Sequence, residues 1–290
     1  MWDSLLNPID NLPSLPVADT IERANDWLLS VIGDATRNIS LFLGDRGLMG
    51  SFTDALLWLP PFVLIVIISL IAWRLSRAGV AVFTFFGLIL IYNMGYWVGA
   101  VQTITLILIS VGISIVIGVP VGILSTRSDL VHRIVWPILD FMQTMPAFVY
   151  LIPAVFFFRI GVVSAMIATV VFSMPPVIRL TGLGIRQVSK EVVEAATSFG
   201  ANEWQKLTKV QLPLAKPTIM AGINQCIMLA LSMVVIAAMI GAKGLGASVL
   251  RGIQRLDIGG GFASGLAVVI LAIILDRVTQ SNKKKKLTGE

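Results

Sequence analysis

Long runs of apolar residues without charge are the feature that most limits how this chain can fold. A helix needs about 20 such residues to cross the ~30 Å hydrocarbon core of a membrane. Of the 290 residues, 56% are hydrophobic and only 13% are charged, which is not the composition of a soluble domain. We therefore predict an all-α integral membrane protein with about seven transmembrane helices. The predicted spans are 55–73, 80–98, 103–124, 137–157, 162–178, 218–241 and 262–276.

The fourth predicted span, 137–157, is interrupted by polar residues and prolines. Asp140, Gln143, Pro146 and Pro153 all fall inside it. A broken helix at membrane depth is tolerated where neighbouring helices satisfy the backbone groups that it frees. We therefore expect this span to face the protein interior rather than lipid.

Basic residues indicate how the chain is oriented. If the polar segment 180–216 is cytoplasmic, most of the Lys and Arg residues fall on that side, and the connection 98–102 on the other side has none. This asymmetry predicts a multi-pass protein of the cell (plasma) membrane with its N-terminus outside and its C-terminus in the cytoplasm. The Lys283–Lys286 run in the basic tail 281–290 is expected to attract anionic lipids. Charge placed in this way does not favour a nucleic-acid partner.

The segment 17–43 alternates apolar and charged residues at the spacing of an amphipathic helix. It is too charged to cross the membrane, and we expect it to lie along the outer interface or to brace the bundle. A helix packed into a partner would show the same pattern. The predicted organisation is then an external segment 1–52, two first spans in 53–98, a core domain 99–280 and the tail.

Small residues recur every four positions in the third span, at Ser110, Ser114, Gly118 and Gly122. Such a stripe lets two helix backbones approach closely in lipid. It predicts a tight helix interface, either within this subunit or with a second copy.

A polar segment of helix-forming residues separates the fifth and sixth spans. Lys190–Ser198 is predicted to be a short helix, and Gly200 can supply the left-handed turn that ends it. A charged unit of this kind between two apolar spans is a surface that a soluble partner could hold.

A second short helix is predicted directly after this turn. Asn202 can cap it, and Gln205 three residues later completes a capping box. We expect the helix to end near Leu212, because Pro213 disfavours helical geometry in the residue before it. The whole unit is predicted to be a helix, a tight turn and a helix.

The residues of this unit resemble the cytoplasmic "EAA" loop of ABC importer permeases, whose helix docks into a cleft on an ATPase subunit. The glutamate, the two alanines, the glycine and the Leu-Pro pair fall at the family's spacing. The resemblance implies that the ATPase is contacted by Glu194, Ala195, Ala196, Ser198, Gly200, Leu212 and Pro213.

Other stretches resemble the permeases of osmoregulatory uptake systems for glycine betaine, proline betaine and related quaternary amines. They are 139–150, 174–179, 183–188 and 221–237. The resemblance implies the type I ABC importer permease fold. It also implies an importer made of a permease homodimer, two ATP-binding subunits and an external glycine betaine-binding protein or fused domain. ATP and Mg would belong to the ATPase, and this chain would bind no cofactor. The alternatives are a permease for choline, carnitine or an amino acid, and an ion-coupled carrier or channel.

Polar and aromatic groups at membrane depth are candidates for the translocation path, because polar groups there are costly. They are Gln143, Met145, Phe148, Tyr150, Asn224, Ser232 and Met233. The same groups could instead serve as hydrogen bonds between helices or as aromatic packing.

The residues needed for catalysis are missing from the sequence. His132 is the only histidine, so neither a zinc site nor a Ser-His-Asp triad can be assembled. No GxxxxGK[ST] phosphate-binding loop occurs. The single cysteine, Cys226, is expected to be a packing residue. We predict a transport protein that is not an enzyme and that takes its energy from a partner.

Overall fold

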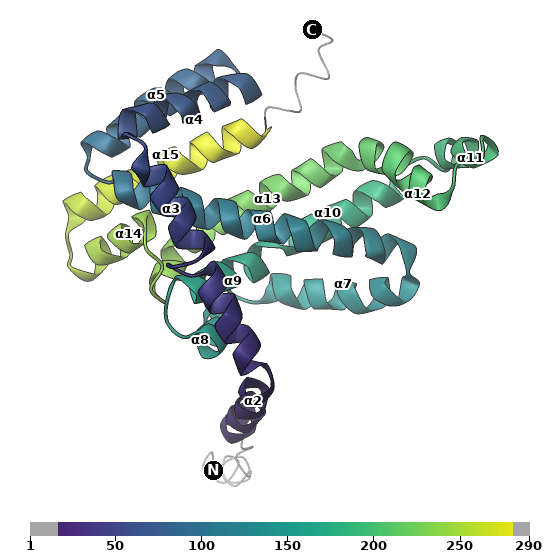
Figure 1. Cartoon of the computed structure of the whole chain (residues 1–290), viewed down its shortest axis with the longest axis horizontal. Coiled ribbons are helices and arrows are strands. Elements are labelled where there is room, and N and C mark those ends of the chain that lie inside the picture. The colour runs from purple at the N-terminus through teal and green to yellow at the C-terminus, as the bar shows by residue number, and fades with distance from the viewer. Residues whose placement is uncertain (1–16, 281–290) are drawn as a thin grey trace, which may run out of the picture.

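The computed structural model describes residues 17–280, which fold into helices joined by short turns (Figure 1). The elements are α2 Val17–Leu43, α3 Leu48–Trp58, α4 Pro61–Leu75, α5 Ala78–Asn93, α6 Trp97–Arg127, α7 Asp129–Thr144, η1 Ala147–Tyr150, α8 Leu151–Phe158, α9 Val162–Ser173, α10 Pro175–Arg186, α11 Lys190–Ser198, α12 Glu203–Gln205, η2 Lys206–Gln211, α13 Leu212–Ala238, α14 Leu245–Gln254 and α15 Ile258–Gln280. No strand occurs in this range. The predictions for residues 1–16 and for Lys283–Lys286 lie outside the described residues.

Apolar helices of spanning length are present where the sequence predicts them. Among residues 17–280, four helices are long and apolar enough to cross a membrane: Trp97–Arg127, Val162–Arg186, Glu203–Ala238 and Ile258–Gln280. Two bent helix pairs could each form one further span, and α5 is a shorter apolar helix. Each of the predicted spans overlaps one of these elements, so the all-α membrane fold is confirmed.

Two predicted spans are sharply bent rather than straight. The first does not begin at residue 55, because the chain turns by 103° between Asp26–Trp58 and Pro61–Leu75. Pro60 and Pro61 mark the break, and neither has an N–H for a helical hydrogen bond. The fourth is broken by 114° at Met145 and Pro146, where Met145 is extended (ψ 132°) as expected for a residue before proline.

Two boundaries and one whole helix differ from the sequence predictions. The second span ends at Asn93 rather than at residue 98, and Gly95 (φ +78°) makes the turn into α6. The sixth span ends at Ala238 rather than at residue 241, and Gly241 (φ +95°) lies in the short turn before α14 begins at Leu245. This helix was not predicted, since its glycine-rich start has the composition of a loop.

The stripe of small residues on α6 forms an interface within the subunit, with α10. Ser110 and Ser114 are fully buried. A Cβ atom on Gly122 would lie 2.7 Å from the Cβ of Thr181 and 2.8 Å from the carbonyl oxygen of Ile178. The contact with a second copy, the other option left by the sequence, is not needed to explain these residues.

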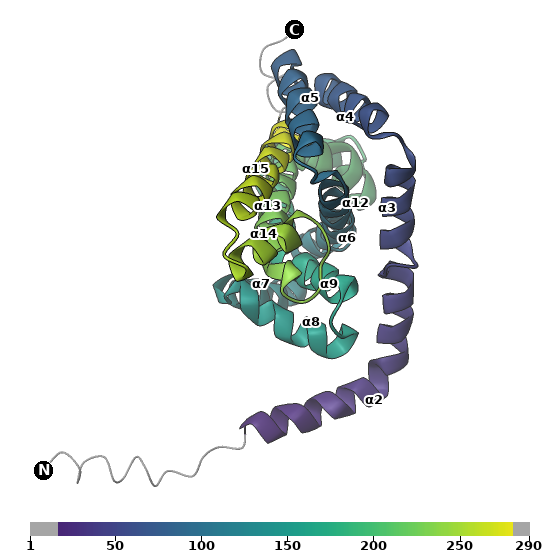
Figure 2. The same cartoon turned by 90° about the vertical axis from the view of Figure 1, so that its left-hand side faces the viewer.

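The helices are arranged around a centre formed by α6, α9, α10 and α13, with α4, α5 and α15 on one side (Figure 1). Helix α2 has the predicted bounds and continues along the outside of the bundle into α3 (Figure 2). It contacts α8, and its Trp27 side chain is 65% exposed. That α2 lies at the outer membrane interface stays a prediction.

Candidate coupling surface and transport path

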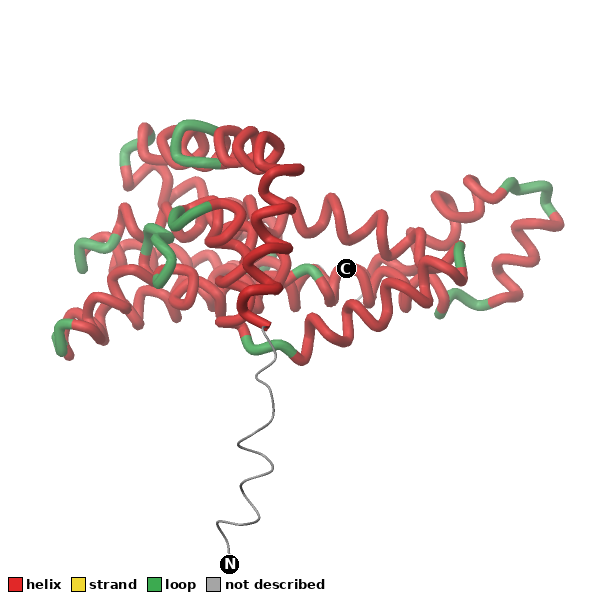
Figure 3. Tube along the Cα trace, turned by 90° about the horizontal axis from the view of Figure 1, so that it is seen from below, coloured by secondary structure: helices red, strands yellow, loops and turns green. Residues whose placement is uncertain are grey.

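Helix α11 stands away from the bundle, at the end opposite α14 (Figures 1 and 3). None of its residues is buried. Glu194 and Ala195 are exposed, and Ala196 is partly covered. A helix with no buried face gains little stability from packing against its own subunit, so its surface is available to another protein.

Gly200 ends α11 in the predicted left-handed conformation, with φ +80°. The N–H of Gly200 donates to the carbonyl of Thr197 (2.9 Å), and that of Ala201 donates to Ala196 (3.0 Å). This pair of bonds is a Schellman motif. A Cβ on Gly200 would meet no atom within 4 Å, so glycine is needed here for its backbone conformation and not for space.

The capping box after this turn is present as predicted. The Oδ1 atom of Asn202 accepts from the N–H of Gln205 (2.8 Å), and the Oε1 atom of Gln205 accepts from the N–H of Asn202 (3.0 Å). These bonds fix how the chain enters the next helix.

The prediction that this second helix ends near Leu212 is wrong. It continues as one helix from Glu203 to Ala238, a length of 36 residues. Pro213 lies in its interior, two residues after the end of the π-helical segment Lys206–Gln211. In a π turn the backbone hydrogen bonds span five residues instead of four, so some backbone groups near this point are not paired in the α-helical pattern. Proline has no N–H to donate, so it can be placed there without breaking the helix. Leu212 and Pro213 therefore belong to the start of the sixth span.

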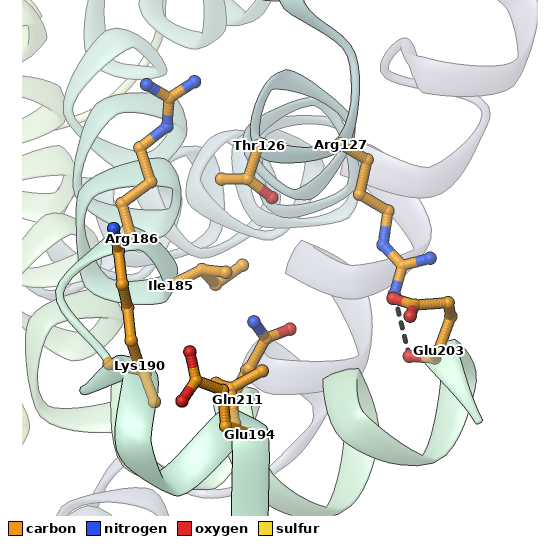
Figure 4. A pocket seen from close by; sticks show the side chains of 10 residues that line it. Thr126, Arg127, Ile185, Arg186, Lys190, Glu194, Glu203 and Gln211 are labelled. Carbon is orange, nitrogen blue, oxygen red and sulfur yellow. Dashed lines mark hydrogen bonds between the residues drawn. The ribbon is translucent and has the colours of Figure 1, made fainter. Parts of the chain in front are cut away.

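The base of the projecting unit surrounds a cavity of about 520 Å³ (Figure 4). Its walls include Arg186 at the end of α10, Glu194 of α11 and Gln211. Arg127, at the end of α6, donates a hydrogen bond to the carbonyl of Glu203 (3.0 Å), and Arg186 donates to that of Ser125 (3.0 Å). These two arginines tie the base to α6, which positions α11 relative to the spans.

Electrostatics at the start of α11 favour an ionised glutamate. The hydroxyl of Ser189 donates to the carboxylate of Glu191, and this bond lowers the pKa of Glu191 below its usual value. A negative charge in the first turn also complements the helix dipole.

The seven predicted path residues do not lie together. Gln143 and Asn224 both line a cavity of about 490 Å³ on the side of α13. Tyr150 and Met233 are instead buried in the apolar core around α8, α9 and α13, where Met145 also packs. Phe148 and Ser232 are exposed, and the Ser232 hydroxyl donates to the carbonyl of Met228 (3.0 Å).

Two residues that line this cavity were not among the predicted path residues. Gln225 is the neighbour of Asn224, and Asp276 comes from α15. The sequence carried only a weak signal for Asp276, because this acid is the last residue of the predicted span 262–276 and not at its centre. That α15 brings it beside α13 could not be read from the sequence.

The isolated histidine and cysteine have structural surroundings. The His132 ring lies 4.4 Å from that of Trp136, measured between centroids, and Cys226 is fully buried beside Ser173. Within residues 17–280, no group of three or more His, Cys, Asp or Glu side chains could hold a metal ion.

A helical membrane bundle with a projecting, unburied helix defines the class of a transport permease. The chain belongs to the family of binding-protein-dependent transport system inner membrane components, whose model matches residues 118–286. It is 51% identical over 278 residues to the glycine betaine transport system permease protein OpuAB of Bacillus subtilis, covering 96% of this chain and 98% of that one. It is 52% identical over 285 residues to the glycine betaine/carnitine transport permease protein GbuB of Listeria monocytogenes, covering 95% and 99%.

The fold is also shared with a solved structure. The inward-facing MetNI methionine ABC transporter matches with a TM-score of 0.56 and 23% identity, covering 66% of this chain and 94% of that chain. The similarity to this structure concerns the fold alone.

Proposed function

We propose that this chain is the membrane-spanning subunit of an ATP-driven importer of glycine betaine or a related quaternary amine. Two relatives that match almost the whole chain are named as glycine betaine permeases, which supports this substrate class. One of them is also named for carnitine, so carnitine is the second candidate substrate. In this proposal the chain is no enzyme, and ATP and Mg are bound by a separate ATPase.

The observation that carries the coupling part of the proposal is the unburied helix α11 on a fixed base. The Schellman turn, the capping box and the two arginine hydrogen bonds hold this helix in one orientation. We infer that α11 docks into the ATPase through the predicted contact residues and that Leu212 and Pro213 carry the motion into α13. The coupling loop 180–216 is then cytoplasmic, with the N-terminus outside and the C-terminus inside.

A second copy of the chain is proposed to pack against an open stripe of α13. Gln225, Met228 and Ser232 are exposed on this otherwise central helix, at helical spacing, and Met239 is exposed directly after it. Gln225 and Ser232 are polar, which fits a solute path at Gln225 and Met228 and a protein partner at Ser232 and Met239 better than lipid. The importer then has two permeases, two ATPases and a glycine betaine-binding protein or fused domain outside. We keep the predicted division of each permease into an external segment 1–52, two first spans in 53–98, a core domain 99–280 and a basic tail 281–290. The tail is proposed to lie near anionic lipid.

The test is uptake of labelled glycine betaine by the complex reconstituted with its ATPase and binding protein, with carnitine, choline and proline betaine as competitors. The matched pair of variants is Ala195→Arg on α11 and Gln254→Arg on α14, both at exposed positions at opposite ends of the molecule. Ala195→Arg is expected to abolish ATPase association and uptake while the bundle stays folded, and Gln254→Arg is expected to leave association intact. Uptake without any ATPase would contradict the proposal and favour a carrier.

A further inference from the structure

The cavity beside α13 has a lining that differs from the rest of the bundle. Its walls come from α7, α9, α10, α13 and α15, and its volume is about 490 Å³, within the usual range for small-molecule sites. The residues that matter for its chemistry are Gln143, Asn224, Gln225 and Asp276, together with Phe172 and Met228. With Gln280 and Met142, which also line it, four amides, one carboxylate, one aromatic ring and two thioethers surround one space.

The polar groups of this cavity are only partly satisfied within the chain. The Oδ1 atom of Asn224 is buried and has no hydrogen-bond partner in the described structure. Asp276 accepts a hydrogen bond from Gln280, but no Lys or Arg among residues 17–280 lies within ion-pair distance of its carboxylate. An unpaired buried acceptor is costly, and the partly exposed Asp276 carboxylate has no basic partner among the described residues.

We propose that this cavity is a transit site for a small zwitterion that carries a quaternary ammonium group. A quaternary ammonium has no N–H to donate, so it is attracted by negative charge, by carbonyl dipoles and by aromatic faces. Asp276 offers the negative charge, and Phe172 offers the aromatic face. The carboxylate of the zwitterion needs donors, and the amide NH₂ groups of Gln143 and Gln225 can supply them.

This inference rests on the proposed function, because it names where the proposed solute is held inside the membrane subunit. Gln143 and Asn224 were predicted as path residues from polarity alone. Because both residues line the cavity, the inference gives them one shared role, which is to hold the solute. It also assigns the negative charge that attracts the cation to Asp276, a residue that nothing else in the described structure connects with transport.

Cysteine labelling tests the site without relying on transport. In a Cys226→Ala background, Met228→Cys places a thiol at the cavity wall, and Tyr92→Cys places one at an exposed position near the end of α5, outside the cavity and away from the α13 stripe. The full complex is treated with the cationic reagent trimethylammonioethyl methanethiosulfonate and with the neutral methyl methanethiosulfonate. The ratio of the cationic to the neutral rate is expected to be roughly threefold to tenfold higher at Met228→Cys than at Tyr92→Cys, as one nearby, partly screened carboxylate would give.

Two further measurements decide the outcome. Asp276→Asn is expected to lower the rate ratio at Met228→Cys to that at Tyr92→Cys, and excess glycine betaine is expected to slow labelling at Met228→Cys only. If the ratio does not depend on Asp276, or if glycine betaine gives no protection, the inference is overturned. Uptake by the wild-type complex is measured in parallel. Failed uptake contradicts the proposed function, whereas normal uptake with unselective labelling contradicts the transit site alone.

Discussion

At the scale of single residues, Gly200 controls the geometry of the projecting unit. Its φ of +80° is unfavourable for any residue with a Cβ, and the surrounding space is empty. Gly200→Ala should therefore destabilise the turn by about 1 kcal/mol through the backbone alone. We expect weaker coupling of ATP hydrolysis to uptake, with little change in the thermal unfolding of the bundle.

The control for this substitution is Gly79→Ala, at the start of α5. A Cβ there also meets no atom within 4 Å, but the backbone has no positive φ. Coupling should be unchanged in this variant. Equal losses in both variants would show that the conformation of Gly200 is not what matters.

The hydrogen bond from Ser189 to Glu191 predicts a measurable pH effect. Because the pKa of Glu191 is lowered in the fold, its contribution to stability is present above the usual glutamate pKa and is lost as the pH falls through the lowered value. Ser189→Ala should raise the pKa of Glu191 towards its ordinary value. An NMR titration of labelled glutamate side chains measures this shift, and a Glu191 pKa that stays unchanged would contradict the assigned cause.

At the scale of helices, the contact of α6 with α10 depends on the absence of a side chain. Gly122→Ala would force a Cβ against Thr181 and against the backbone of Ile178, and overpacking of this kind typically costs about 1–3 kcal/mol. The expected result is a lower unfolding temperature in detergent or nanodiscs.

Gly112→Ala on the same helix is the matched control. A Cβ at Gly112 meets nothing within 4 Å, so the substitution should be neutral or slightly stabilising. An unfolding temperature that falls equally in both variants would mean that helix packing at Gly122 is not the cause.

The sequence predicted helices far better than the places where they bend or join. Apolar length identified the spans, and the Asn202 capping box and the Gly200 turn were both read from local residue chemistry. The continuous helix through Pro213 was missed because a residue before proline disfavours helical geometry, which predicts a helix end. The π segment Lys206–Gln211 and the packing of α13 against α10 override this local preference. That the side chains of Tyr150 and Met233 pack in the apolar core could not be predicted, because a sequence does not show the direction of a side chain.

At the scale of the whole molecule, the open stripe on α13 predicts where two copies meet. In a Cys226→Ala background, Ser232→Cys should form a disulfide between copies under mild oxidation, because the side chain is exposed on a helix that is otherwise central. Gel electrophoresis without reductant detects the linked dimer.

Phe86→Cys provides the comparison, since Phe86 is 64% exposed on α5, at the side of the bundle away from α13. It should remain monomeric on the gel. Dimers at Phe86→Cys and none at Ser232→Cys would place the subunit contact elsewhere.

The uninterrupted helix from Glu203 to Ala238 has a mechanical consequence. At 1.5 Å per residue, its 36 residues form a lever about 54 Å long, with the proposed ATPase contact near one end and the α14 side of the bundle at the other. With a pivot near Gln211, a tilt of a few degrees moves the far end, which is ~40 Å away, by roughly 2–3 Å. The π segment Lys206–Gln211 lies where such a lever would need its pivot, between the part that is pushed and the part that moves the bundle.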